Sequence, residues 1–339
     1  MTKVILLDVG HGNCAIVRSG GATAVIDSPT GAMLLDTLRD LEVETVETAI
    51  ISHADKDHIA GILSLLTSDN IRVERIYVNP DSQKNTRIWR DFRVAVAVAE
   101  QKGSCKVVTG LSTTIPGTIE VGAARIAVLC PSSALALTGV GGTTASGRKV
   151  DANTLSGVLR IDAEEGAGSI LMAADMDETG LAEAIDAETN LEADVLVFPH
   201  HGGLPGTSDA QAFTTRLLTA VRPDTVVFSN GRGRHDNPRL GVVETVRHQG
   251  CAIACTQLSE RCHSQPVDAQ DFLEPLRASG RTKGFSCAGS MTLELQPKGQ
   301  RTPEHSARHR SFISEHVATP MCRHRSAGDE TDSHLGLPR

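Results

Sequence analysis

Short apolar segments alternate with polar turns along most of the chain, and their lengths and periods predict a mixture of strands and helices. Runs of aliphatic and β-branched residues bounded by turn residues predict strands, at Lys3–Leu7, Cys14–Val17, Ala22–Asp27, Thr48–Ser52, Arg75–Val78, Lys106–Val108, Thr118–Val121, Arg125–Leu129, Leu155–Ile161, Ser169–Ala173, Asp194–Phe198, Thr225–Ser229, Ala252–Thr256 and Met291–Leu295. Apolar residues at helical spacing predict helices, at Gly31–Asp40, Ile59–Leu66, Trp89–Lys102, Thr179–Ala187, Asp209–Ala220 and Gly241–His248. The segment Pro131–Val150 is rich in Gly, Ser and Thr, which is typical of a mobile loop. Periodicity alone does not separate an α+β fold from an α/β fold.

The polar stretch directly after the predicted strand Thr48–Ser52 carries the clearest chemistry. Four side chains able to bind a metal ion, His53, Asp55, Asp57 and His58, fall within six residues. Imidazole and carboxylate groups suit zinc, manganese and related divalent ions. Positions 53, 55 and 57 share one face of an extended chain, whereas the adjacent residues 57 and 58 point apart. A loop that only caps a strand needs a single Ser or Asp, so this pattern predicts a site for two neighbouring metal ions.

The spacing His-x-Asp-x-Asp-His after an apolar strand resembles the metal-binding signature of the metallo-β-lactamase superfamily. Its form with Asp at the third position, followed by Ile59-Ala60-Gly61-Ile62, is most similar to the soluble domain of the DNA-uptake channel protein ComEC. Other segments resemble motifs of the same family in the same order, at Leu7–Ala15, Ala24–Ser28, Ile170–Asp175, Val195–Gly203 and Asn230–Pro238. The resemblance runs from about residue 3 to about residue 296. It implies an α+β fold, an αββα sandwich of two mixed β-sheets with helices on the outer faces.

The resemblance also implies a role for each candidate ligand. His53 and Asp55 would hold one ion, and Asp57 and His58 would hold the other. Asp175 matches the family's carboxylate that bridges both ions. A buried Asp without a partner is costly, which favours a metal over the alternative role of a helix cap.

Further candidates support these ligands or complete the set. His200 is the expected remaining ligand of the second ion, and His201 is expected to face substrate or to support a ligand, although the two could be exchanged. Asp27 matches an Asp that orients a ligand imidazole or the loop backbone, or else is an ordinary turn residue. Asn153 stands where many superfamily members have a further His, and is a weak oxygen ligand or no ligand.

The loop Asn230–Pro238 supplies candidates for substrate binding. His235 is expected to donate a proton to a leaving oxygen or to hold a phosphate. Arg232 and Arg234 are expected to bind phosphate oxygens. An Arg-rich Gly loop is also what an ordinary solvated turn looks like. His11, in a Gly-His-Gly turn, lines the mouth of the site or is only a turn residue.

The charge and composition of the chain limit the kinds of partner that it is expected to bind. The chain carries a net charge of −8, and residues 1–296 alone carry −10. An acidic protein is not steered as a whole to a polyanion, so nucleic acid would be held by a local patch such as the Arg loop. Aromatic residues make up 3% of the chain, which disfavours a base-stacking platform. No apolar run approaches the length of a membrane span, and the N-terminus enters a strand without a signal sequence. These features predict a cytoplasmic protein.

Two parts of the chain fall outside the resemblance. A Cys-containing insert lies at about residues 257–287, and residues 297–339 have little apolar periodicity, which predicts a disordered tail after a hydrolase domain at 1–296. The late cysteines leave a structural zinc open, held by Cys255, Cys262, Cys287 and either Cys251 or His263, although the spacing lacks a Cys-x-x-Cys pair.

The preferred function is a metal-dependent hydrolase, a phosphodiesterase or nuclease that acts on DNA. Two divalent ions, Zn²⁺ or Mn²⁺, would supply a metal-bound hydroxide, with Asp57 and His235 as the catalytic groups. One alternative is a metallo-hydrolase of another ester or amide, such as a lactone, thioester or lactam, which would require an apolar pocket. The other is a non-catalytic metal-binding module within a larger complex.

Overall fold

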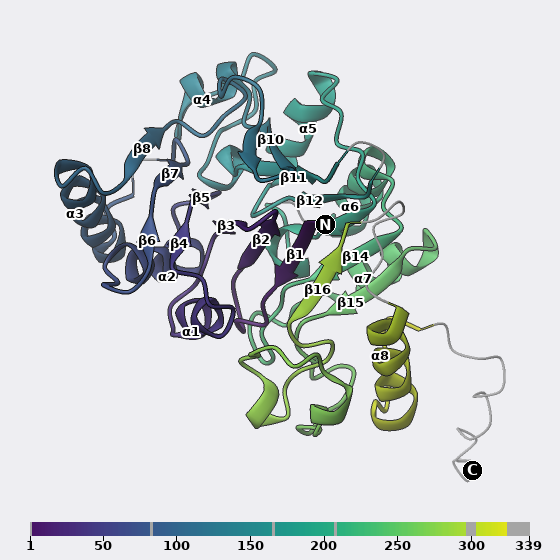
Figure 1. Cartoon of the computed structure of the whole chain (residues 1–339). Helices are drawn as coiled ribbons and strands as arrows, with labels where there is room; N and C mark the ends of the chain where they lie inside the picture. The colour runs from purple at the N-terminus through teal and green to yellow at the C-terminus, as the bar shows by residue number, and fades with distance from the viewer. Residues whose placement is uncertain (1, 82–83, 165–166, 207–208, 296–302, 324–339) are drawn as a thin grey trace, which may run out of the picture.

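The first half of the chain forms a mixed sheet that a strand from the C-terminal region completes (Figure 1). The computed structural model describes residues 2–81, 84–164, 167–206, 209–295 and 303–323. The strand order is β16-β1-β2-β3-β5-β7-β8, with bounds Met291–Glu294, Thr2–Leu6, Ala15–Ser19, Ala22–Ile26, Thr48–Ile51, Arg75–Val78 and Lys106–Thr109. Strands β1 to β3 pair antiparallel, whereas β3, β5, β7 and β8 run parallel. Parallel neighbours need crossovers, which contain the helices α1 (Met33–Asp40), α2 (Lys56–Leu66) and α3 (Arg87–Gln101).

The second half forms another seven-stranded sheet, in the order β15-β14-β13-β12-β11-β10-β9. These strands span Ala252–Cys255, Thr225–Phe228, Val195–Val197, Ser169–Met172, Val158–Asp162, Ala124–Cys130 and Ile119–Val121. Strands β12 to β15 run parallel, and their crossovers contain α5 (Glu178–Asp186), α6 (Ala210–Val221) and α7 (Leu240–His248). Shorter elements are β4 (Thr45–Val46), β6 (Arg72–Val73), α4 (Ser133–Thr138), η1 (Asn153–Leu155), η2 (Pro199–Gly202), η3 (Gln270–Phe272) and η4 (Arg281–Lys283).

Alternating side chains show that the two sheets pack face to face. In β1, Val4 and Leu6 belong to a buried cluster shared with the second sheet, whereas Ile5 packs with the helices α1 to α3. In β13, Val195 faces the same shared cluster, whereas Leu196 packs with α5 to α7. Because successive side chains of a strand point to opposite faces, each sheet is covered by the other sheet on one side and by helices on the other. This is the αββα sandwich that the resemblance implied.

The segment expected to be a mobile loop, Pro131–Val150, contains the short helix α4. The Ser132 side chain accepts a hydrogen bond from the backbone N–H of Leu135, which caps the start of that helix. Leu135 is buried together with Val150 and Leu155 in a small separate cluster. The loop therefore has an apolar anchor that its Gly-rich composition did not indicate.

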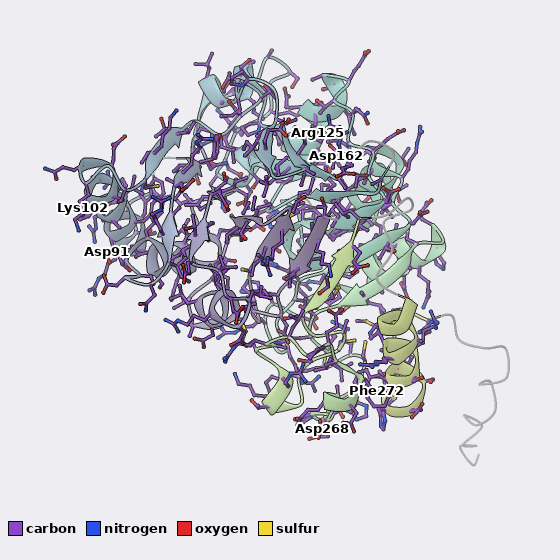
Figure 2. The ribbon with its side chains drawn as sticks, viewed as in Figure 1. Asp91, Lys102, Arg125, Asp162, Asp268 and Phe272 are labelled. Carbon is purple, nitrogen blue, oxygen red and sulfur yellow. The ribbon has the colours of Figure 1, made fainter. Side chains whose placement is uncertain are left out.

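The prediction of a disordered tail is wrong for residues 303–323, and the rest of 297–339 lies outside the described residues. Helix α8 (Pro303–His316) packs against the second half of the chain through Phe312 and Ile313, which are buried. The ring centroid of Phe312 lies 5.7 Å from that of Phe272, which Figure 2 labels beside this helix. Arg247 of α7 donates hydrogen bonds to the carbonyls of Met321 and Arg323 beyond the helix. A few apolar residues suffice to dock this segment, and they are too sparse to give a clear period. No helix in the part of the chain described here is long and apolar enough to cross a membrane.

Candidate metal centre

The candidate metal ligands lie at the ends of strands from both sheets. Asp57 and His58 occupy the first turn of α2, which follows β5 after a four-residue loop, and the backbone N–H of His58 donates to the carbonyl of Asp55. Asp175 follows β12, and His201 lies in the turn η2 that follows β13. Ligand-bearing loops at the carboxyl ends of strands are the usual location of sites in sheets with parallel strands.

Four of these side chains converge on one point. Asp57, His58, Asp175 and His201 each offer a ligand atom, and these atoms all lie within 4.8 Å of one another. His58 Nε2 lies 3.5 Å from Asp175 Oδ2, and His201 Nε2 lies 3.6 Å from Asp57 Oδ2. Within the described residues, this is the one such group of three or more His, Cys, Asp or Glu side chains. Two imidazoles and two carboxylates form a donor set typical of zinc and manganese.

Buried atoms without partners point into this cluster. His58 Nε2, His201 Nε2 and Asp175 Oδ1 are buried and have no hydrogen-bond partner among the described groups. Buried polar atoms are nearly always satisfied, so three unpartnered atoms around one point indicate a site that fits a cation. Burial lowers the pKa of His58, but the nearby carboxylates of Asp27 and Asp175 outweigh burial and raise it well above its usual value. The cluster therefore favours positive charge, and its residues fit a divalent ion.

The opposite ring nitrogens hold both imidazoles in the orientation that a metal requires. His58 Nδ1 lies 2.9 Å from Asp27 Oδ2, so its proton points to that carboxylate and its Nε2 lone pair faces the cluster. His201 Nδ1 donates to the carbonyl of Ser229 at 2.8 Å, which directs Nε2 inward in the same way. Asp27 is itself held by Ser52, whose backbone N–H donates to Oδ1 at 2.8 Å and whose hydroxyl donates to Oδ2.

Close packing keeps this arrangement in place. Gly61 of α2 lies against the loop after β3, and a Cβ at this position would clash with the Ser28 side chain and lie 2.7 Å from the Pro29 carbonyl oxygen. The backbone N–H of Gly61 donates to the Ser28 carbonyl at 2.9 Å, and that of Ser28 donates to the His58 carbonyl at 2.7 Å. The glycine therefore lets the helix that carries His58 approach the loop that carries Asp27.

The structure brings His201 rather than His200 into the cluster. Both residues have positive φ angles, 51° for His200 and 56° for His201, so the turn twists their side chains apart. His200 Nδ1 lies 3.8 Å from Asp175 Oδ2, and its Nε2 is buried without a hydrogen-bond partner in the described structure. Of the two arrangements that the sequence left open, the geometry places His200 at the edge of the cluster.

His53 and Asp55 contact each other and a lysine that the sequence analysis did not single out. His53 Nε2 lies 2.7 Å from Asp55 Oδ2. Lys84 Nζ lies 2.5 Å from Asp55 Oδ1, 3.2 Å from His53 Nε2 and 3.3 Å from Oδ2 of Asp81. Asn153 begins the turn η1, and none of the described contacts joins its side chain to this group. The sequence does contain a feature that indicates Asp81. The polar segment Asn79-Pro80-Asp81 directly follows an apolar strand, as the His53–His58 stretch does.

Two further histidines stand beside the cluster. His11 Nε2 lies 3.6 Å from Asp57 Oδ2, and its ring centroid lies 4.4 Å from that of His201 and 4.8 Å from that of His235. Burial, followed by the charge of His201, lowers the pKa of His11 to about 4. His235 and Arg234 are exposed. The Gly-His-Gly turn thus supplies a site residue, and the loop that carries His235 lies next to it.

A model of the metallo-beta-lactamase superfamily matches residues 7–201, more than half of the chain. The chain belongs to the metallo-beta-lactamase superfamily. The matched segment contains all four residues of the cluster. Members of this superfamily are metal-dependent hydrolases, which agrees with the donor set found here.

Several solved structures are similar to this chain at low sequence identity. The metallo-beta-lactamase fold protein YhfI from Bacillus subtilis is 14% identical over 75% of this chain and 96% of its own, with a TM-score of 0.47. The metallo hydrolase Igni18 from Ignicoccus hospitalis is 16% identical over 87% of this chain and 100% of its own, with a TM-score of 0.45. A diphosphatase from the PhnP family is 14% identical over 75% and 94%, with a TM-score of 0.41. No curated protein matches the sequence.

Arg232 lies beyond the segment that the superfamily model matches, and its contacts contradict the expectation that it binds phosphate oxygens. Its guanidinium donates to the carbonyls of Leu258, His263 and Ser264 at 2.7 to 2.8 Å, and it lies over the Phe285 ring. Arg232 is buried, so its donors bind the Cys-containing insert and are not available to phosphate. The sequence showed the charge of Arg232 but not the carbonyl oxygens of the insert that surround its guanidinium.

The late cysteines also differ from the expected grouping. Cys255, Cys262 and Cys287 line a cavity of about 20 Å³ together with Cys322 and His309, both from the region predicted to be disordered. Cys251 instead donates to the carbonyl of Pro223, and His263 Nδ1 accepts a hydrogen bond from the backbone N–H of Ala318. Cys287 Sγ lies 3.3 Å from His309 Nε2, but within the described residues no three of these side chains bring their ligand atoms together as the cluster above does. A structural zinc here stays a prediction.

Proposed function

We propose that this protein is a metal-dependent phosphodiesterase that cleaves DNA. The observation that carries the proposal is the convergence of Asp57, His58, Asp175 and His201 beside the His11 and His235 pair. A Zn²⁺ or Mn²⁺ ion held by the four ligands would supply Lewis-acid polarisation of the phosphoryl oxygen and activation of water.

The residues around the cluster suit a phosphodiester. His235 is exposed beside His11 and can deliver a proton to the leaving oxygen. Arg234, in the same exposed loop, offers donors for a phosphate oxygen after the loss of Arg232 as a candidate. Asp57 Oδ2, close to His11 Nε2 and His201 Nε2, can accept a proton from the attacking water.

Two rival functions receive less support from the same features. A lactam, lactone or thioester hydrolase would want an apolar pocket beside the metal, whereas His11 and His235 stand there. A non-catalytic module would not need a complete donor set with oriented imidazoles. The motif resemblance to the soluble domain of ComEC supports DNA among the possible phosphodiesters, and a cytoplasmic location stays a prediction.

The test compares metal-stripped protein with protein loaded with Zn²⁺, Mn²⁺ or Mg²⁺. Substrates are plasmid DNA, single-stranded DNA, RNA, a chromogenic phosphodiester, a lactone and a lactam. We expect DNA cleavage that requires metal and is lost in His201→Ala. His235→Ala should lower turnover roughly 10²- to 10⁴-fold, the range of general acid catalysis, with metal content unchanged. His248→Ala, an exposed histidine of α7, serves as the matched control. A metal-loaded protein that hydrolyses the lactone or lactam but no phosphodiester would overturn the proposal.

A further inference from the structure

The side chains expected to hold a first metal ion already surround a cation of the protein. Lys84 Nζ lies 2.5 Å from Asp55 Oδ1, 3.2 Å from His53 Nε2 and 3.3 Å from Asp81 Oδ2. These are one imidazole and two carboxylates, the donor types that would otherwise bind a divalent ion. The ammonium thus occupies the centre of the group.

Lys84 is largely buried, and so are two of the side chains around it. Its side chain is 14% exposed, and those of His53 and Asp81 are 0% and 1% exposed. Asn79 anchors the loop that leads to it, because its Nδ2 donates to the carbonyls of Ser52 and Leu155 and its Oδ1 accepts from the backbone N–H of Asp81. The strand end that carries His53 and the loop before Lys84 are therefore joined directly.

The atoms that a first ion would need are engaged by the ammonium. The Asp55 carboxylate binds Lys84 Nζ through Oδ1 and His53 Nε2 through Oδ2, and a divalent ion bound to it would meet a like charge at contact distance. His53 and Asp55 are also outside the described group whose ligand atoms gather within 4.8 Å. The first site therefore does not fit a metal while Lys84 is in place.

We propose that the Lys84 ammonium takes the place of a first metal ion, so that the protein binds a single divalent ion at Asp57, His58, Asp175 and His201. This inference rests on the metal cluster of the proposed function. The ring centroids of His53 and His58 are 5.4 Å apart, so the fixed cation stands next to the ion site. An ammonium attracts and positions an anionic oxygen of the substrate, but it has no empty coordination position with which to activate water.

The test counts the metal bound to the whole chain, residues 1–339. The chain is stripped with a chelator, loaded with excess Zn²⁺ or Mn²⁺, desalted and measured by plasma mass spectrometry. We expect one ion per chain in wild type, and two in Lys84→Met, which keeps the apolar stem and removes the charge. Lys56→Met is the matched control, because this exposed lysine lies between Asp55 and Asp57, and its count should stay at one.

The outcomes separate this inference from the proposed function. Wild type with no bound ion removes the metal centre itself. Two ions in wild type, or a single ion in both wild type and a folded Lys84→Met, shows that Lys84 does not take the place of a metal. Should Lys84→Met not fold, His53→Ala gives an independent reading. It should retain one ion, whereas His201→Ala should retain none, and loss of the ion in His53→Ala would overturn the assignment.

Discussion

Asp27→Asn isolates the hydrogen bond that orients one ligand. Asp27 is buried and accepts hydrogen bonds from the Ser52 backbone, the Ser52 hydroxyl and His58 Nδ1. Asn keeps the shape and the acceptor toward the Ser52 backbone, and it tolerates the φ of 55° at this position better than most residues. The Oδ2 acceptor, which faces His58 Nδ1 and the Ser52 hydroxyl, is replaced by an amide donor, and the hydroxyl can turn to accept from it.

The expected loss follows from the tautomer of His58. With an amide N–H facing it, Nδ1 must become the acceptor, and the ring proton moves to Nε2, which faces the metal cluster. Removing such a supporting partner typically costs about 10- to 100-fold in metal affinity. This corresponds to about 1.4 to 2.8 kcal/mol of binding free energy.

The assay is a Zn²⁺ titration in competition with a chromogenic chelator, with thermal unfolding of the metal-free protein measured in parallel. Asp194→Asn is the control, because Asp194 accepts hydrogen bonds from the Ser169 backbone and hydroxyl just before β13, at the opposite end of the strand from His201. A folded Asp27→Asn protein with the wild-type dissociation constant would refute the orienting role.

Three further outcomes are expected. His201→Ala should weaken Zn²⁺ binding more than His200→Ala in the same titration, because His201 belongs to the cluster and His200 lies at its edge; the reverse order would exchange their roles. Gly61→Ala should lower the free energy of unfolding in urea by about 1–3 kcal/mol through overpacking, and an unchanged midpoint and slope would contradict the close approach of α2. Burial raises the pKa of Cys14 and Cys130 from 9.0 to about 12, so both should resist iodoacetamide at pH 8 until the protein unfolds. The folded state holds these protons more tightly, so their contribution to stability is full below pH 9 and is lost as the pH rises toward 12; rapid alkylation of native protein would show that the thiols are accessible.

The sequence predicted those parts of the fold and site that depend on local order. Apolar runs predicted strands such as β1 and β13, whereas the sandwich itself was implied by the motifs that resemble the metallo-β-lactamase superfamily. Asp57 and His58 were identifiable because they are adjacent and follow an apolar strand. Lys84 was not, because it lies in a loop whose approach to His53 depends on Asn79 bonding across to a neighbouring strand end.

Other differences arise from contacts between distant segments. From the sequence alone, Arg232 is expected to bind substrate. In the structure its guanidinium donates instead to carbonyls of the insert. His200 and His201 are adjacent in the sequence, and only the positions of their rings relative to Asp57 and Asp175 distinguish them. Helix α8 docks through few apolar residues, whose partners lie in the second half of the chain.

The four cluster residues are divided equally between the two sheets: Asp57 and His58 follow a strand of the first, and Asp175 and His201 follow strands of the second. A bound ion would therefore act as a cross-link between the two sheets, in addition to direct hydrogen bonds such as those from Ser229 Oγ to the Gly12 carbonyl and from Gln257 Nε2 to Asp8 Oδ1. An ion that binds only the folded state adds stability that grows with its free concentration, so metal supply would raise the free energy of unfolding of the packed sandwich. Separation of the sheets would in turn release the ion, so that metal retention reports directly on whether the two halves remain together.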